Sequence, residues 1–97
     1  MPRPEQPIDG QGPCADFARG LRRERDRAGI TYRQMAKMTT YSVSVLSCAA
    51  NGKYPPSWEV AWAYLRACKV PTSQQSYWKR LWTKARNEAE VAENASS

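Results

Sequence analysis

The sequence predicts an all-α protein, a compact bundle of about five helices, and three observations support this class. Threonine is followed three residues later by glutamine at Thr31 and again at Thr72, which is the capping-box pattern that opens helices. Apolar residues recur at spacings near 3.6 residues in several segments. No segment alternates apolar and polar residues as a half-buried strand does.

The chain has 97 residues. A chain of this size forms one domain, whose modest core buries roughly 65% of the unfolded surface. Residues 1–13 are rich in proline, glycine and glutamine, and this composition predicts a disordered arm. The folded domain is expected over residues 14–86. Residues 87–97 are acidic and small, which predicts an acidic helical extension that ends in a frayed tail.

The first two helices are expected over residues 14–28 and 31–38, with a short polar break over residues 39–41. Gly29 stands where a glycine commonly ends a helix. Thr31 is expected to cap the second helix through its capping box. The apolar face of the first helix consists of Phe17, Leu21 and Ala28.

The third helix is expected over residues 42–50, with Ser42 as its N-cap. Asn51 and Gly52 are expected to end it, because both residues tolerate the left-handed backbone conformation. Residues 53–56 contain two prolines and are therefore expected to be extended.

The fourth helix is expected to begin after Ser57 and to be interrupted at Pro71. The fifth opens at the second capping box, formed by Thr72 and Gln75, and carries an apolar stripe. That stripe consists of Tyr77, Trp78, Leu81, Trp82 and Ala85. We expect a single core that contains Phe17, Leu21, Met35, Ala36, Leu46, Val60, Leu65 and Leu81.

Tryptophan and cysteine are both expected in the core. The tryptophans lie beside apolar neighbours on helices, which favours packing over stacking on bases. The cysteines are widely spaced and odd in number, so they indicate reduced thiols that act as small apolar residues rather than a disulfide framework. These residues are Trp58, Trp62, Trp78, Trp82, Cys14, Cys48 and Cys68.

The charge balance favours an anionic partner. The net charge is +6, which indicates nucleic acid first and a membrane surface second. The chain has no histidine, and no nucleophile–base pair is visible, so neither an enzyme nor a metal or cofactor site is expected. The longest apolar run, residues 60–65, cannot span a bilayer, and the first residues do not form a signal peptide. A cytoplasmic location is therefore expected.

Residues 29–52, GITYRQMAKMTTYSVSVLSCAANG, carry the functional signal. They contain two short capped helices joined by a tight break, and the second is followed by Asn51, Gly52 and Lys53. This pattern resembles the helix-turn-helix of the phage-repressor-like (XRE-type) DNA-binding family. It is most similar to actinobacterial members, in which a Pro-Ser-Trp segment such as residues 56–58 follows. The resemblance covers residues 17–86.

The resemblance implies a transcriptional regulator that binds double-stranded DNA with the helix over residues 42–50 in the major groove. The positions that would face bases are Ser42, Val43, Ser44, Ser47 and Cys48. The positions that would face the DNA backbone are Thr31, Tyr32, Arg33, Asn51, Gly52 and Lys53. Residues 31–57 contain no acid. Their three cations are Arg33, Lys37 and Lys53, and all three are expected to lie at phosphates.

Two departures from the family pattern affect this prediction. The helix over residues 42–50 has no charge and lacks the Asn, Gln and Arg side chains that make bidentate base contacts, so modest sequence specificity is expected. The family's acidic position near the end of this helix is Ala50, so the arginine matched to it, Arg25, has no acidic partner there. An uncharged helix equally suits a protein-interaction adaptor or antirepressor on the same scaffold.

The fifth helix is the surface available for dimerisation. Two alternatives stay open for its apolar stripe: it covers the core completely, or one edge remains exposed. The second predicts a weak homodimer with Trp78 or Trp82 at its seam and with Tyr77 and Leu81 beside them.

Overall fold

The computed structural model describes residues 8, 10 and 12–95, with side chains up to Glu90. Part of the predicted disordered arm (residues 1–7, 9 and 11) and the last two residues of the predicted frayed tail lie outside the described residues. All regular structure in the described part is helical, which confirms the predicted all-α class. The elements are α1 (Pro13–Ala28), α2 (Tyr32–Met38), α3 (Val43–Ala49), α4 (Trp58–Ala67), a 3₁₀ turn η1 (Thr72–Gln74) and α5 (Gln75–Ala95).

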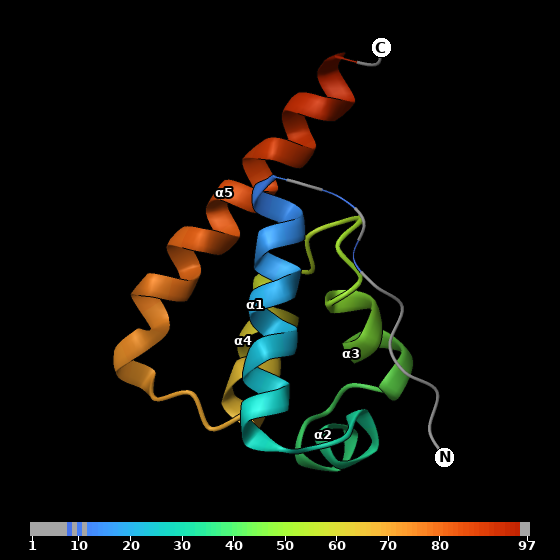
Figure 1. The fold of residues 1–97 in the computed structure, drawn as a ribbon, viewed down its shortest axis with the longest axis vertical. Helices are drawn as coiled ribbons and strands as arrows, with labels where there is room; N and C mark the ends of the chain where they lie inside the picture. The colour runs from blue at the N-terminus through green and yellow to red at the C-terminus, as the bar shows by residue number, and fades with distance from the viewer. Residues whose placement is uncertain (1–7, 9, 11, 96–97) are drawn as a thin grey trace.

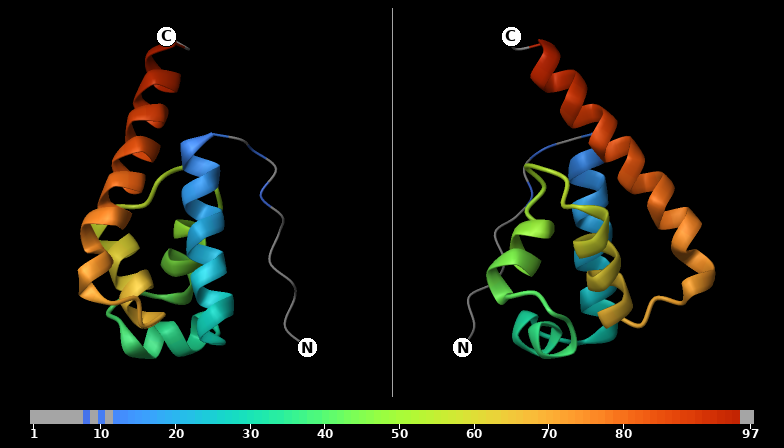
Figure 2. Two further views of the ribbon diagram at one scale, coloured as in Figure 1. Left: turned by 60° about the vertical axis from the view of Figure 1, so that its left-hand side comes forward. Right: turned by 180° about the vertical axis from the view of Figure 1, so that it is seen from behind.

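Helix α1 is the central element of the bundle. It packs against α5 on one side and against α4 behind it, while α2 and α3 pack against each other and against α4 (Figure 1). Seen from behind, α3 and α5 lie on opposite sides of α4 (Figure 2). The C-terminal part of α5 extends past the start of α1 and beyond the bundle (Figures 1 and 2). The surfaces of α3 and α5 therefore face different sides of the molecule.

Local capping fixes the boundaries of α1–α4. Gly29 ends α1 in the left-handed conformation, with a φ of 68°. The capping box that opens α2 is complete, because the Thr31 hydroxyl accepts from the Gln34 N–H and the Gln34 side chain accepts from the Thr31 N–H. The side chains of Ser42 and Ser57 cap α3 and α4 in the same way, each accepting from the N–H three residues later. These predictions are confirmed.

The start of the fifth helix differs from the prediction. Thr72 makes no side-chain cap, so the second capping box is wrong. Pro71 has a ψ of 151° and accepts a hydrogen bond of 3.0 Å from the Gln74 N–H, which creates a 3₁₀ turn before α5 begins. Helix α4 ends earlier than Pro71 because Lys69 adopts a φ of 67° and reverses the chain.

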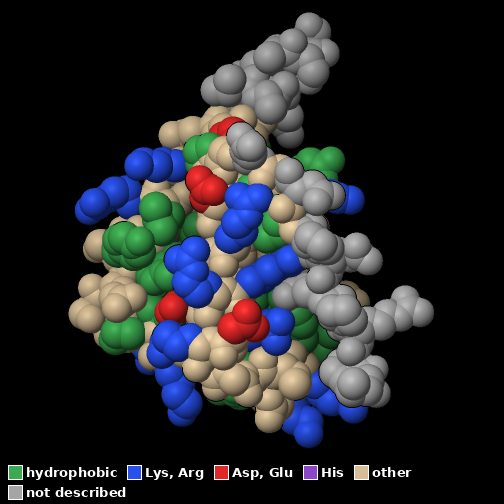
Figure 3. Space-filling view, in the orientation of Figure 1, with side chains coloured by type: hydrophobic (Ala, Val, Ile, Leu, Met, Phe, Trp, Pro, Cys, Tyr) green, Lys and Arg blue, Asp and Glu red, His purple; other side chains and the backbone are tan. Residues whose placement is uncertain are grey.

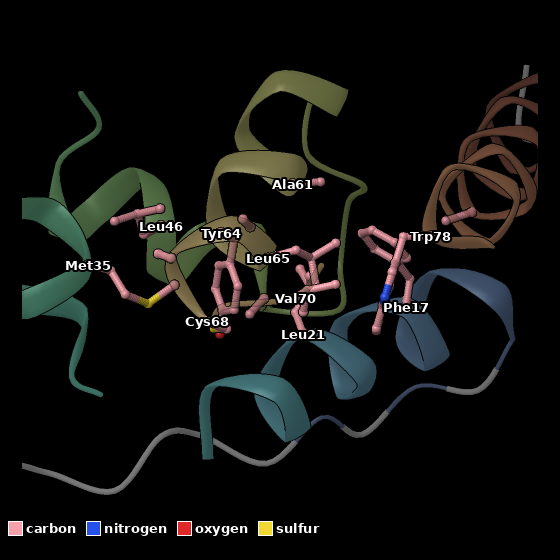
Figure 4. Close-up of a cluster of buried hydrophobic side chains, with 14 residues drawn as sticks. Phe17, Leu21, Met35, Leu46, Ala61, Tyr64, Leu65, Cys68, Val70 and Trp78 are labelled. Atoms are coloured by element: carbon pink, nitrogen blue, oxygen red, sulfur yellow. The ribbon is translucent and has the colours of Figure 1, made fainter. Parts of the chain in front are cut away.

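The predicted core is confirmed as one cluster, with its boundary now defined (Figure 4). Five of the eight predicted residues are buried, whereas Ala36, Val60 and Leu81 are half-buried at its edge. Tyr64, at the centre of α4, is fully buried, as Leu65 and Cys68 are. The ring of Tyr64 therefore contributes one of the largest apolar surfaces of the core.

The tryptophans divide into two groups. Trp78 is 6% exposed and packs edge-on against Phe17, with ring centroids 6.1 Å apart. Helix α1 approaches this ring through Gly20, where a Cβ atom would lie 3.1 Å from the indole. Trp58, Trp62 and Trp82 are only half-buried and form a cluster between α4 and α5. All four pack on the core, but three of them also contribute to the surface.

Candidate nucleic-acid interface

Helices α2 and α3 form a helix-turn-helix whose turn is closed by Thr39. The Thr39 hydroxyl donates to the Met35 carbonyl at 3.0 Å and accepts from the Tyr41 N–H at 3.2 Å. Met35 from α2 and Leu46 from α3 are both completely buried in the core. These two side chains fix the pair of helices to the rest of the bundle, so that the opposite side of α3 faces outward.

Most of the predicted base-facing residues lie on the outer side of α3. The exposed residues on this side are Ser42, Val43, Ser44 and Cys48. Ser47 is half-buried, and its hydroxyl donates a hydrogen bond of 3.3 Å to the Ser44 carbonyl. Val45 is also 41% exposed, although it was not among the predicted base-facing residues. Neighbouring side chains on a helix can both be buried, as Tyr64 and Leu65 are, so the position of Val45 next to Leu46 gave no signal of its exposure.

The predicted backbone-facing residues separate into exposed and packed positions. Thr31, Arg33, Lys37 and Lys53 are exposed and lie around the two helices. Tyr32 is half-buried: its hydroxyl is 3.2 Å from that of Tyr64, and the Arg25 guanidinium lies 4.5 Å from its ring centroid. Tyr32 therefore packs against the core and is not one of the exposed residues.

The loop after α3 is shaped by Asn51 and Gly52. The Asn51 side chain accepts a hydrogen bond of 2.8 Å from the Lys53 N–H, which closes an Asx turn. Gly52 has a φ of 82°, whereas Asn51 does not use the left-handed conformation. The side chain of Ile8 lies against Gly52 and would have to shift to admit a Cβ atom at this position. The turn thus presents Lys53 and Tyr54 outward, and Tyr54 is 73% exposed.

The α1 arginine that reaches the end of α3 is Arg22. Its Nε donates a hydrogen bond of 2.7 Å to the Ala50 carbonyl. Arg25, which the sequence comparison matched to this position, instead donates to the Ile30 carbonyl at 3.0 Å and lies over the ring of Tyr32. A cation at the end of α3 compensates the partial negative charge of the carbonyls.

The three thiols have different environments. Cys48 is exposed on α3, so its prediction as a core residue is wrong, whereas Cys68 is completely buried and Cys14 is half-buried. Burial raises the pKa of Cys68 from 9.0 to about 11, and Glu24 adds to this rise while Arg25 and Arg27 oppose it. Burial, followed by the charge of Glu88, also raises the pKa of Cys14. Cys48 is the accessible thiol among the three.

A groove of about 360 Å³ runs beside α3, between this helix and the loop that leads to α4. Its walls are largely apolar, and its outer margin includes Val45 and Tyr54. The lining residues are Ser44, Val45, Cys48, Ala49, Tyr54, Pro55, Pro56, Ser57 and Val60. The predicted reading face is therefore partly an apolar surface.

Positive charge surrounds this region. Residues 31–57 carry three cations and no acid, whereas on the front of the molecule, where α1 lies, the cationic side chains are interspersed with acids (Figure 3). Over the described residues, no group of three or more His, Cys, Asp or Glu side chains is arranged to hold a metal ion. Searched over the same residues, no helix has the length and apolar character needed to cross a membrane.

The fold and the outward-facing α3 define a small helix-turn-helix protein. Residues 16–78 match the family described as "Helix-turn-helix domain", and the chain belongs to this family. The match covers most of the chain and confirms the resemblance to XRE-type helix-turn-helix proteins; it does not bear on the actinobacterial members in particular. No curated protein and no solved structure matched the chain.

Proposed function

We propose that this protein is a transcriptional regulator that binds double-stranded DNA with α3 in the major groove. One observation supports this proposal: the helix-turn-helix region, residues 31–57, contains no acid, and its three cations, Arg33, Lys37 and Lys53, are all exposed. Phosphate groups would pair with these cations, and their neutralisation releases counterions from the duplex. This function requires no cofactor and is exercised in the cytoplasm.

The exposed side chains at the start of α3 determine how strongly this DNA contact distinguishes between sequences. Ser42 and Ser44 offer hydroxyl groups that hydrogen-bond to any base, and Val43 offers an apolar contact to a thymine methyl group. None of these side chains makes the bidentate contacts that discriminate strongly between bases. The proposed regulator therefore obtains most of its affinity from phosphates and reads sequence modestly, with contributions at the margins from Ser47 and Cys48.

A second candidate function is supported by the apolar groove beside α3. Val43 and Val45 are 43% and 41% exposed, and Tyr54 at the groove margin is 73% exposed. A surface of this kind suits a helix–helix contact with another protein. An adaptor or antirepressor that uses the helix-turn-helix to bind a protein partner is thus the alternative function.

The proposed regulator forms a weak homodimer through α5, which would place two copies of α3 on one duplex. Tyr77 is 55% exposed and Trp82 and Leu81 are half-buried, so these side chains are available for a seam. Trp78 is packed on α1 and contributes little external surface. Sedimentation equilibrium over a wide range of concentrations tests this dimer, and a monomer at every concentration, both free and on a duplex with two half-sites, contradicts it.

A titration of the protein against two duplexes distinguishes DNA binding from the adaptor function. One duplex has a random sequence, the other is the promoter region of the protein's own gene, and each is measured at two salt concentrations. The regulator predicts binding to both duplexes that weakens steeply with salt, with modest preference for the promoter. An absence of binding to either duplex at low salt would contradict it and favour the adaptor.

A further inference from the structure

A second group of cations lies between Glu59 of α4 and Glu88 of α5, apart from the cations of the proposed DNA contact. Residues 60–87 contain six cations and no acid, a stretch as free of acids as the helix-turn-helix itself. Four of these cations lie on α5: Lys79, Arg80, Lys84 and Arg86. The helix α5 and the helix α3 proposed to contact DNA lie on opposite sides of α4 (Figure 2).

A groove of about 480 Å³ lies between α5 and the start of α4. It is lined by Trp58, Gln75, Ser76, Lys79, Arg80, Thr83 and Lys84. Along α5 it extends from Gln75 to Lys84, about 14 Å at the rise of an α-helix. One wall is the indole of Trp58, and the opposite side carries three cations with their aliphatic stems. The groove thus combines an apolar wall with a positively charged rim.

The rings of Trp58 and Trp82 beside this groove are already in contact with other side chains of the protein. Trp58 stacks on Trp62, with ring centroids 5.7 Å apart and an interplanar angle of 13°. The Lys79 ammonium lies 4.8 Å from the Trp58 ring centroid and 5.1 Å from that of Trp82. A nucleic-acid base could stack on these rings only by displacing Lys79, which argues against a single-strand binding surface.

The remaining cations of the rim are available to a partner. Within the described part of the chain, neither Arg80 nor Lys84 forms an ion pair, and both side chains are exposed. A DNA duplex is a convex rod that would meet these cations but would leave the apolar wall of the groove exposed. A polypeptide with carboxylates on both sides of an apolar side chain satisfies the rim and the wall together.

We propose that the groove between Trp58 and α5 is a docking site for an acidic amphipathic segment of another protein. An apolar side chain of that segment lies in the groove, against the part of Trp58 that Lys79 leaves uncovered and against the aliphatic stem of Lys84, and flanking Asp or Glu side chains pair with Arg80 and Lys84. No residue of α3 lines the groove, so one molecule can hold a duplex at α3 and an acidic protein segment at the groove. A regulator built this way recruits its partner to DNA.

A labelled synthetic peptide tests this site by fluorescence anisotropy with the full chain. The peptide has twelve residues, a central leucine pair and flanking glutamates, with both ends blocked. We expect saturable binding, weakened about tenfold by Arg80→Glu, because the substitution removes one attraction and adds one repulsion. Arg23→Glu is the matched control: it changes an exposed arginine of α1 by the same charge and should leave peptide binding unchanged.

A second peptide, with serine in place of the two leucines, tests the apolar wall without altering the protein. It should bind more weakly than the first. Equal binding of both peptides, or equal weakening by Arg80→Glu and Arg23→Glu, would reduce the effect to general charge attraction and overturn the proposal. Absence of peptide binding overturns it as well, and a duplex affinity that falls with Arg80→Glu as it does with Lys53→Ala would assign the groove to nucleic acid.

Discussion

The Nε atom of Arg22 lies 2.7 Å from the carbonyl oxygen of Ala50, and this hydrogen bond joins the middle of α1 to the C-terminal end of α3. Ala50 is the last residue of the helix-turn-helix before the loop that carries Lys53. The bond therefore fixes the end of α3 and the start of the loop that carries Lys53 relative to the core. The acid–arginine pair of the family pattern is absent here, as Ala50 led us to expect, and an arginine contacts the backbone carbonyl of residue 50 in its place.

Replacing Arg22 with methionine keeps an apolar side chain at this position but removes the guanidinium, and the variant should be less stable than the natural protein. A charged donor is removed from a carbonyl at a helix end, and we expect a loss of about 1–2 kcal/mol in the free energy of unfolding. Urea denaturation measures this as a lower midpoint with an unchanged slope. Arg23→Met, at an exposed position of the same helix, is the control, and an equal effect of the two variants would contradict the assigned role.

Local signals explain why α1–α3 could be predicted from the sequence. Gly29, Thr31 and Ser42 act within a few residues of themselves, so their effect does not depend on the tertiary fold. The end of α4 could not be predicted in this way. Lys69 takes a left-handed conformation without being glycine or asparagine, and the buried side chains around it impose this turn.

The candidate site shows the same division between local and tertiary information. The exposure of Val43 and Ser44 follows from placing Leu46 in the core, which the spacing of apolar residues indicated. Which α1 arginine meets Ala50 depends on how two helices distant in sequence cross, and no local pattern in the sequence encodes that crossing. The groove at Trp58 depends likewise on how α4 and α5 meet.

Lys53→Ala should weaken binding to any duplex without changing sequence preference. Lys53 is exposed at the end of the helix-turn-helix, where it is proposed to neutralise one phosphate. The log–log slope of affinity against salt should become shallower by about 1 per protomer. Titrations at four or more salt concentrations measure this slope. If the slope of the variant equals that of the natural protein, Lys53 does not contact DNA.

Val43→Arg should strengthen DNA binding. The side chain of Val43 is 43% exposed at the start of α3, and an arginine there can reach a phosphate or the edge of a guanine. Ser73→Arg adds the same charge in the exposed 3₁₀ turn and serves as the control. Equal gains for both variants would mean that only net charge matters. Unchanged DNA binding together with a lost protein contact would favour the adaptor function.

The buried thiol of Cys68 should make stability depend on alkaline pH. Burial raises its pKa in the folded protein from 9.0 to about 11, so the unfolded chain loses this proton first as the pH rises. The contribution of the neutral thiol is complete below pH 9 and is lost as the pH rises toward 11. The difference in unfolding free energy between the natural protein and Cys68→Ala should therefore shrink over this interval. A constant difference would contradict the assigned burial.

The accessible thiol of Cys48 offers the most direct test of how α3 contacts DNA. In a Cys14→Ser background, a thiol reagent at pH 8 should modify Cys48, because Cys68 is completely buried and resists modification. The rate is measured while duplex is added at low salt, with binding followed in parallel. Our account predicts that the modification rate falls in proportion to the fraction of protein bound, because α3 lies in the major groove. A rate that stays unchanged when the protein is fully bound to duplex would contradict it.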